Sequence, residues 1–234
     1  MMKQLLPLCA FALLCAACGG ASDRNPDDAT HASSDTSSKK DTAAAPAPVV
    51  KDGKRYGHKS GIITMKSSGI ITATTTFYFD DYGEKMAAYN EIEHEAEGKK
   101  TTFRNVNLLD GESSILYDEA NKLGMKMPDR DGMIYYFPDF DEMSQAGRDS
   151  IGYQKLESRT ILGKECAGHA LKRNQFPIRV WMWEGIPLRT ELHGTAEPLV
   201  WEATSVEVDV PVAAEKFVLP AGIKMTEAKT PKIE

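Results

Sequence analysis

The sequence predicts a mainly β domain of the α+β type, built as a β-sandwich or a strongly curved antiparallel sheet with one or two short helices. Two observations predict this fold class. From Val49 onward, short runs rich in Ile, Thr, Tyr, Phe and Val are separated by Gly, Asp, Asn and Pro, which is typical of antiparallel strands. Helical periodicity is scarce there, and many short strands in series favour a sandwich or a curved sheet.

The predicted strands are short runs of β-forming residues, most of them bounded by turn signals such as Asp110-Gly111 and Gly163-Lys164. In chain order they are Gly61 to Lys66, Ile70 to Phe79, Met86 to Ala96, Thr101 to Leu109, Ser113 to Asp118, Met133 to Phe137, Ser158 to Leu162, Cys166 to Arg173, Ile178 to Glu184, Leu188 to His193 and Leu199 to Val208.

Two short segments are predicted to be helical. The first runs from Phe140 to Ala146, with Asp139 as its N-cap. Phe140 and Met143 would lie on one face of it, so we expect it to dock against the sheet. The second is a single turn at Val212 to Lys216.

The N-terminus has the order of a secretory signal. One early charge, Lys3, precedes the apolar run from Leu5 to Ala17, and small residues follow before a cysteine. The run is shorter than the roughly 20 residues that span a bilayer, so residues 1–17 are predicted to be a cleaved signal peptide.

Ala16, Ala17 and Cys18 resemble the lipobox of bacterial lipoproteins, which predicts acylation of Cys18. Cys15 departs from the usual pattern, in which leucine is commonest, and an ordinary signal peptidase site is the alternative. Several acyl chains on one cysteine would hold the protein stably at a membrane. Gly19 after the cysteine resembles the pattern of lipoproteins forwarded to the outer membrane, which predicts a cell-envelope location there.

Residues 18–48 are predicted to be the lipidated cysteine and a disordered tether, because no aromatic or large aliphatic side chain follows Cys18 there. Residues 49–234 are predicted to form a single domain. Only Cys166 then remains in the mature domain, so it has no intrachain disulfide and its core must hold it together. The formal net charge of −6 argues against a nucleic-acid partner, and we expect a monomer.

A search for catalytic motifs finds no nucleophile elbow, phosphate-binding glycine loop or dinucleotide fingerprint, so we expect no enzymatic activity and no cofactor. No metal site is predicted either. His94 lacks a second histidine at helical spacing, and Cys166 and His169 would point to opposite faces of a strand. His58 and His193 have no obvious partner and are interpreted as surface residues.

Apolar side chains on both faces of some strands suggest what the domain does. Between Ile178 and Trp183 neither face is wholly polar, and the segment from Met133 to Phe137 shows the same pattern. One interpretation is a thick core with a helix packed on one face. The other is an apolar cavity or groove. Its candidate ligand-binding residues are Tyr135, Phe137, Trp181, Met182, Trp183 and Trp201.

Three stretches resemble a bacterial lipoprotein family catalogued only as a domain of unknown function. They are Gly61 to Thr64 with Phe77 to Gly83, Trp181 to Arg189 with Glu202 to Val206, and Pro211 to Gly222. The layout is also similar to periplasmic carriers of the LolA/LolB type. That resemblance implies an unclosed half-barrel, in which a strongly curved antiparallel sheet wraps around helices and shelters acyl chains. It transfers no catalytic residue.

Two functions remain open. The first is a membrane-anchored, non-catalytic carrier or binding protein for an acyl chain or another apolar ligand. The second is an envelope interaction or structural module, in which the protein's own side chains fill the barrel and the outer surface docks to a partner.

Overall fold

The computed structural model describes residues 54–69, 71–96, 98–111, 113–127, 136–173, 176–195 and 197–227. Several predictions lie outside these ranges. They are the signal peptide, the acylation of Cys18, the tether and the placement of Tyr135. None of the helices within the described ranges has the length and apolarity to span a membrane.

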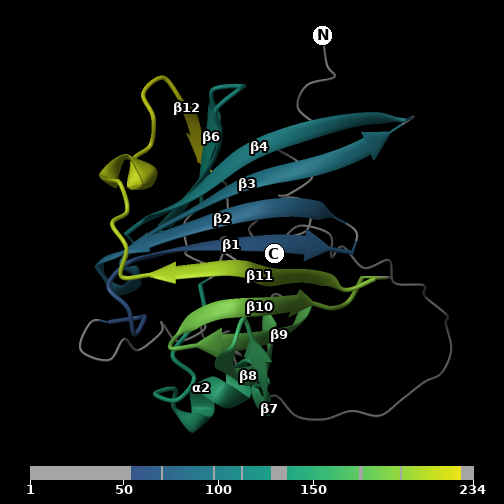
Figure 1. Ribbon diagram of the computed structural model, residues 1–234, viewed down its shortest axis with the longest axis vertical. Helices are drawn as coiled ribbons and strands as arrows, with labels where there is room; N and C mark the ends of the chain where they lie inside the picture. The colour runs from purple at the N-terminus through teal and green to yellow at the C-terminus, as the bar shows by residue number, and fades with distance from the viewer. Residues whose placement is uncertain are drawn as a thin grey trace, which may run out of the picture. The chain divides into compact units, whose positions relative to one another are not determined.

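The described residues form one sheet of twelve strands (Figure 1). The strands are β1 Gly61–Ser68, β2 Thr72–Asp80, β3 Lys85–Ala96, β4 Lys99–Asp110, β5 Ser113–Asp118, β6 Leu123–Met127, β7 Gln154–Ile161, β8 Lys164–Arg173, β9 Phe176–Trp183, β10 Ile186–Leu192, β11 Leu199–Val208 and β12 Lys224–Glu227. The helical segments are η2 Asp81–Gly83, α2 Gln145–Ser150 and η4 Ala214–Phe217.

The strand order is β12-β6-β5-β4-β3-β2-β1-β11-β10-β9-β8-β7, and the sheet is not closed. Two runs of sequential antiparallel strands, β1 to β6 and β7 to β11, meet where β1 pairs with β11. The single parallel pair joins β12 to β6. This confirms the predicted mainly β fold and the unclosed, curved sheet.

Both faces of the sheet carry clusters of apolar side chains, and we call the faces inner and outer. The inner face carries the side chains of Ile63, Phe77 and Trp201, which belong to the largest apolar cluster. The outer face carries a second cluster, which includes Val106 and Tyr117. Burial on both faces explains why several strands show no clean alternation between apolar and polar residues.

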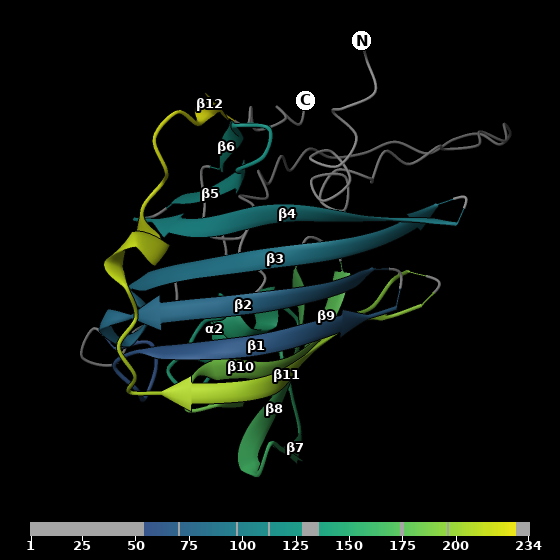
Figure 2. The ribbon, with the colours of Figure 1, turned by 45° about the horizontal axis from the view of Figure 1, so that its top comes forward.

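Different segments cover the two faces. Phe137, Phe140 and Met143, in the segment leading into α2, pack against the inner face of β8 and β9. On the outer face, side chains of the C-terminal segment, residues 209–223, pack against β3 to β5. Figures 1 and 2 show this yellow segment running past the ends of β1 to β4 toward β12.

Some predicted boundaries were wrong. The helix begins at Gln145 instead of Phe140, because Ser144 caps it by accepting a hydrogen bond from the backbone of Gly147. Asp139 instead caps a turn, since its carboxylate accepts from the backbone N–H groups of Asp141 and Glu142. Tyr136 and Phe137, the described end of the segment predicted from Met133, are not in a strand. The turn predicted at 212–216 is observed at Ala214–Phe217, and β6 and β12 were not predicted.

Candidate functional site

The structure describes five of the candidate ligand-binding residues and places them on both faces of the sheet. Trp181 pairs with Arg189 and lies on the outer face, as does Trp183. Trp201 pairs with Thr190 and lies on the inner face, where Met182 and Phe137 also pack. The exposed fractions are 2% for Trp181, 5% for Trp201, 3% for Phe137 and 9% for Met182. These four side chains are therefore buried against other residues of the domain and do not line an open ligand site.

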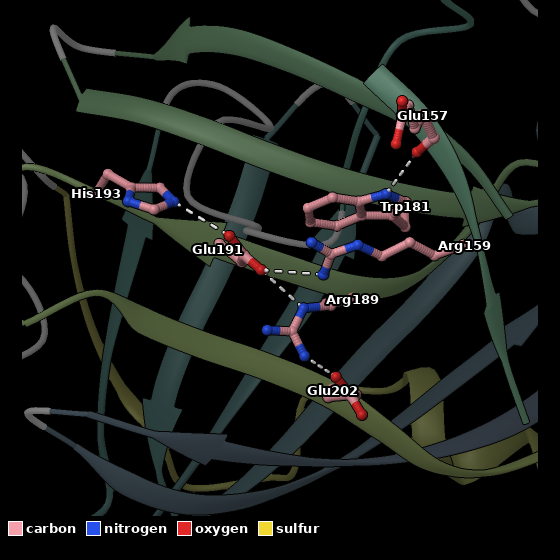
Figure 3. Close-up of polar contacts among 7 residues, drawn as sticks. All are labelled: Glu157, Arg159, Trp181, Arg189, Glu191, His193 and Glu202. Carbon is pink, nitrogen blue, oxygen red and sulfur yellow. Dashed lines mark hydrogen bonds and ion pairs between the residues drawn. The ribbon is translucent and has the colours of Figure 1, made fainter. Parts of the chain in front are cut away.

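Trp181 packs against residues of β7 and β8, and Figure 3 shows its contacts with Glu157 and Arg159 of β7. The Arg159 guanidinium stacks over the indole at 3.9 Å, and the indole N–H donates a 3.1 Å hydrogen bond to the backbone carbonyl of Glu157. Gly168 lies beside the ring, and a Cβ there would come within 2.8 Å of the indole nitrogen. Glycine is thus required at position 168 so that β8 can approach the tryptophan.

Glu191 is the centre of the ion-pair network beside Trp181. Its carboxylate lies 2.8 Å from the Arg189 Nε, 3.6 Å from the Arg159 Nη1 and 3.2 Å from the His193 Nε2, and Arg189 also pairs with Glu202 (Figure 3). Burial would raise the pKa of Glu191, but the hydrogen bonds from Arg189 and His193 hold it below its ordinary value. The expectation that His193 has no partner was wrong.

His58 joins three segments at the far end of the same face. Its Nδ1 lies 2.8 Å from the Asp209 carboxylate, its Nε2 lies 3.1 Å from the Glu184 carboxylate, and its ring stacks on Trp183 at 4.8 Å. Lys164 covers the same indole, with its Nζ 3.5 Å from the ring centroid. The hydrogen bond from His58 lowers the pKa of Asp209. His58 therefore also has partners that the sequence did not reveal.

His169 is a buried titratable group on the inner face. Its ring stacks on Phe140 at 4.4 Å, and its Nδ1 lies 3.1 Å from the Tyr153 hydroxyl. Burial lowers the pKa of His169 to about 4, with a partly opposing effect from Asp141. The imidazole is therefore neutral at pH 7. Cys166 lies on the outer face, so the prediction that Cys166 and His169 point to opposite faces is confirmed.

The inner face differs between its two halves. Over β8 and β9 it is covered by the segment leading into α2. Over β3 to β6 the register places on it a set of apolar side chains that are all only partly buried, and these are Ile92, Phe103, Leu109, Met125 and Met127. We call this set the apolar strip. Within the described ranges, no helix joins an apolar cluster with it.

The sequence analysis missed a set of polar residues on the same face. Thr75, Asn90 and Asn107 are buried there, and Asn105 lies beside them partly exposed. The available signal was their spacing, since Asn105 and Asn107 are two residues apart and must share a face of any strand. Because asparagine is depleted in strands, the sequence did not lead us to predict a row of polar residues on the sheet.

The described ranges contain no three His, Cys, Asp or Glu side chains grouped as a metal site requires. The ion-pair network around Glu191 consists of charges that are already paired, and the indole of Trp181 beside it is buried. The inner face over β3 to β6 instead offers apolar surface next to amide groups. That combination suits binding of a largely apolar molecule with a few hydrogen-bonding groups.

Comparisons with known proteins found no matching family model and no matching curated protein. Solved structures do match. An uncharacterized conserved protein from Thermus thermophilus is 7% identical, with a TM-score of 0.48 over 74% of this chain and 92% of that chain. A DUF1329 family protein from Desulfovibrio piger is 11% identical, with a TM-score of 0.35 over 69% and 90%. LprF from Mycobacterium bovis is 10% identical, with a TM-score of 0.32 over 68% and 89%. These likenesses are too distant to give the chain a family, a ligand or an activity.

Proposed function

We propose that this chain is a membrane-anchored envelope protein whose β domain binds an acyl chain or a similar elongated apolar ligand without catalysing a reaction. In this proposal residues 1–17 are removed, Cys18 carries the acyl chains, and residues 18–48 tether the domain 49–234 at the outer membrane. The bound ligand and the membrane are its partners, and it needs no cofactor.

The apolar strip on the inner face is the observation that carries the ligand-binding proposal. Five apolar side chains over β3 to β6 keep part of their surface accessible, whereas the apolar side chains over β8 and β9 are buried beneath the segment leading into α2. Accessible apolar side chains grouped on one face of a domain are a common feature of ligand-binding surfaces.

The second candidate function is an interaction module whose interior is filled by its own side chains. It is favoured by the burial of Phe137, Trp181, Met182 and Trp201, which leaves these four side chains closed to a ligand. The two functions differ in what they require of the apolar strip. Only the first requires that substitutions there change ligand affinity.

The ligand-binding proposal predicts micromolar binding of a fluorescent fatty acid by protein carrying Cys18→Ser, which has no acyl chain of its own at that position. Phe103→Asp places a charge within the apolar strip and is expected to weaken binding at least tenfold, because the carboxylate resists desolvation. Fluorescence titration measures this. Thr102→Asp, one residue away on the exposed outer face, is the matched control and should bind as the parent does. No binding by the parent would favour the interaction module.

The anchoring proposal predicts that Cys18→Ser abolishes incorporation of a labelled fatty acid into the protein in the producing cells, because a hydroxyl cannot replace the thiol in the thioether that attaches the lipid. Gel autoradiography of immunoprecipitated protein measures it. Cys15→Ser should leave incorporation intact. Labelling that persisted in the Cys18→Ser protein would refute the assignment.

A further inference from the structure

A row of polar side chains crosses the inner face beside the apolar strip. Thr75 on β2, Asn90 on β3 and Asn105 on β4 are directly paired in the sheet register, and Asn107 follows on the same face of β4. Thr75, Asn90 and Asn107 are 1%, 6% and 4% exposed. A polar group buried this deeply costs free energy unless it finds a hydrogen-bond partner.

The hydrogen bonds along this row run in one direction. Thr75 Oγ1 donates to Asn90 Oδ1 at 2.7 Å, and Asn90 Nδ2 donates in turn to Asn105 Oδ1 at 2.9 Å. The carbonyl oxygen of Asn105 therefore already accepts one hydrogen bond. Its side-chain NH₂ group ends the row, and the residue is partly exposed, so this donor is available to a molecule lying on the inner face.

Asn107 is the buried member of the row whose side-chain oxygen lacks a hydrogen-bond partner among the described residues. Its Oδ1 is shielded from solvent and accepts no hydrogen bond from any residue in the described part of the chain. Leaving a buried acceptor unpaired is costly, and such groups in folded proteins call for a specific explanation. A ligand that brings its own N–H to this position would supply the missing donor.

We infer that Asn105 and Asn107 recognise a secondary amide, so that the preferred ligand is an acyl chain joined to its head group through an amide bond; this rests on the proposed ligand-binding function. Residues two apart on a strand lie about 6.7 Å apart, which allows one side chain to reach each side of a trans amide. Asn105 Nδ2 donates to the ligand carbonyl, and Asn107 Oδ1 accepts from the ligand N–H. Phe103 and Leu109 flank the pair on the same strand face and contact the hydrocarbon.

Two uncharged probes of equal chain length test this. N-methylhexadecanamide and methyl hexadecanoate both carry a carbonyl, but only the first has an N–H. Affinities are measured by displacement of the fluorescent fatty acid from the Cys18→Ser protein. We expect the amide to bind about tenfold more tightly than the ester, the effect of one additional buried hydrogen bond.

Asn107→Leu should abolish this preference, because the amide probe loses the acceptor for its N–H and then binds no more tightly than the ester does to the same variant. The leucine replaces an unpaired polar group with an apolar one of similar size, so the urea midpoint should stay level or rise, which also shows that the variant folds. Asn105→Leu should weaken both probes, because both offer a carbonyl. Thr102→Leu on the outer face should retain the full preference for the amide.

The outcomes separate this inference from the function on which it rests. Equal affinity of the parent for both probes, or a preference that survives Asn107→Leu, would overturn the recognition of an amide while leaving the binding of apolar ligands intact. Failure of the parent to bind the fluorescent fatty acid would instead overturn the proposed function itself.

Discussion

Trp181→Ala is expected to lower the free energy of unfolding by about 3 to 5 kcal/mol. The side chain is 2% exposed, so its removal leaves a cavity between β7, β8 and β9 that the surrounding strands can fill only in part. The variant also loses the stacking of Arg159 and leaves the Glu157 carbonyl without its indole donor. Urea denaturation followed by far-ultraviolet circular dichroism measures the loss.

Trp183→Ala is the matched comparison, because the two tryptophans share a strand face but differ in burial. Trp183 is only partly buried beneath His58 and Lys164, so its truncation leaves a smaller cavity. We expect it to cost less than half as much as Trp181→Ala. A cost below about 1 kcal/mol for Trp181→Ala would contradict its placement in the core.

His169 is expected to make the domain lose stability as the pH falls from about 7.5 to 4.5. Burial lowers the pKa of His169 to about 4, below the value near 6.5 of a histidine in the unfolded chain. Between these two values the unfolded chain binds a proton that the folded protein does not, so stability rises with pH across this window and is complete above it. After allowance for residual solvent screening, the contribution is on the order of 2 kcal/mol.

His169→Phe tests this contribution because it keeps an aromatic ring against Phe140 but cannot titrate. The free energy of unfolding, measured by urea denaturation at several pH values, should fall less steeply in the variant toward pH 4.5. Tyr153→Phe removes only the hydrogen bond to His169, so it should lower stability by a similar small amount at every pH. If the free energy of unfolding varied with pH in the same way for the parent and for His169→Phe, His169 would have the same pKa in the folded and unfolded states, which would contradict the prediction.

Much of the sheet could be predicted because most strands are runs of β-forming residues with turn-forming residues at their ends. The β-forming run of β11 ends at an Asp-Val-Pro turn, and β5 lies between Asp110-Gly111 and Asp118, so the predicted bounds of both strands match the structure. β6 escaped notice because it is short and contains Gly124, whose lack of a side chain makes room for Met225 and Ile223. That packing depends on a segment distant in sequence.

The candidate site was harder to predict because a residue's face depends on the pairing register. Trp181 and Trp201 are on different strands, and a register shift between Pro187 and Arg189 changes the alternation of faces along β10. No local pattern reports such a bulge. The helix was misplaced because both Asp139 and Ser144 are good N-cap residues, and in the structure Ser144 caps the helix while Asp139 caps a turn.

The pairing of β1 with β11 has a consequence for when the chain can fold. Gly61 of β1 faces Val208 of β11, so the two runs of strands join through contacts between residues far apart in sequence. Forming such contacts requires closing a long loop before any of their free energy is recovered, which makes folding slow. During synthesis the two runs of strands cannot join until β11 has left the ribosome. In an exported protein, this delay would keep the emerging chain in the open state that a secretion channel requires.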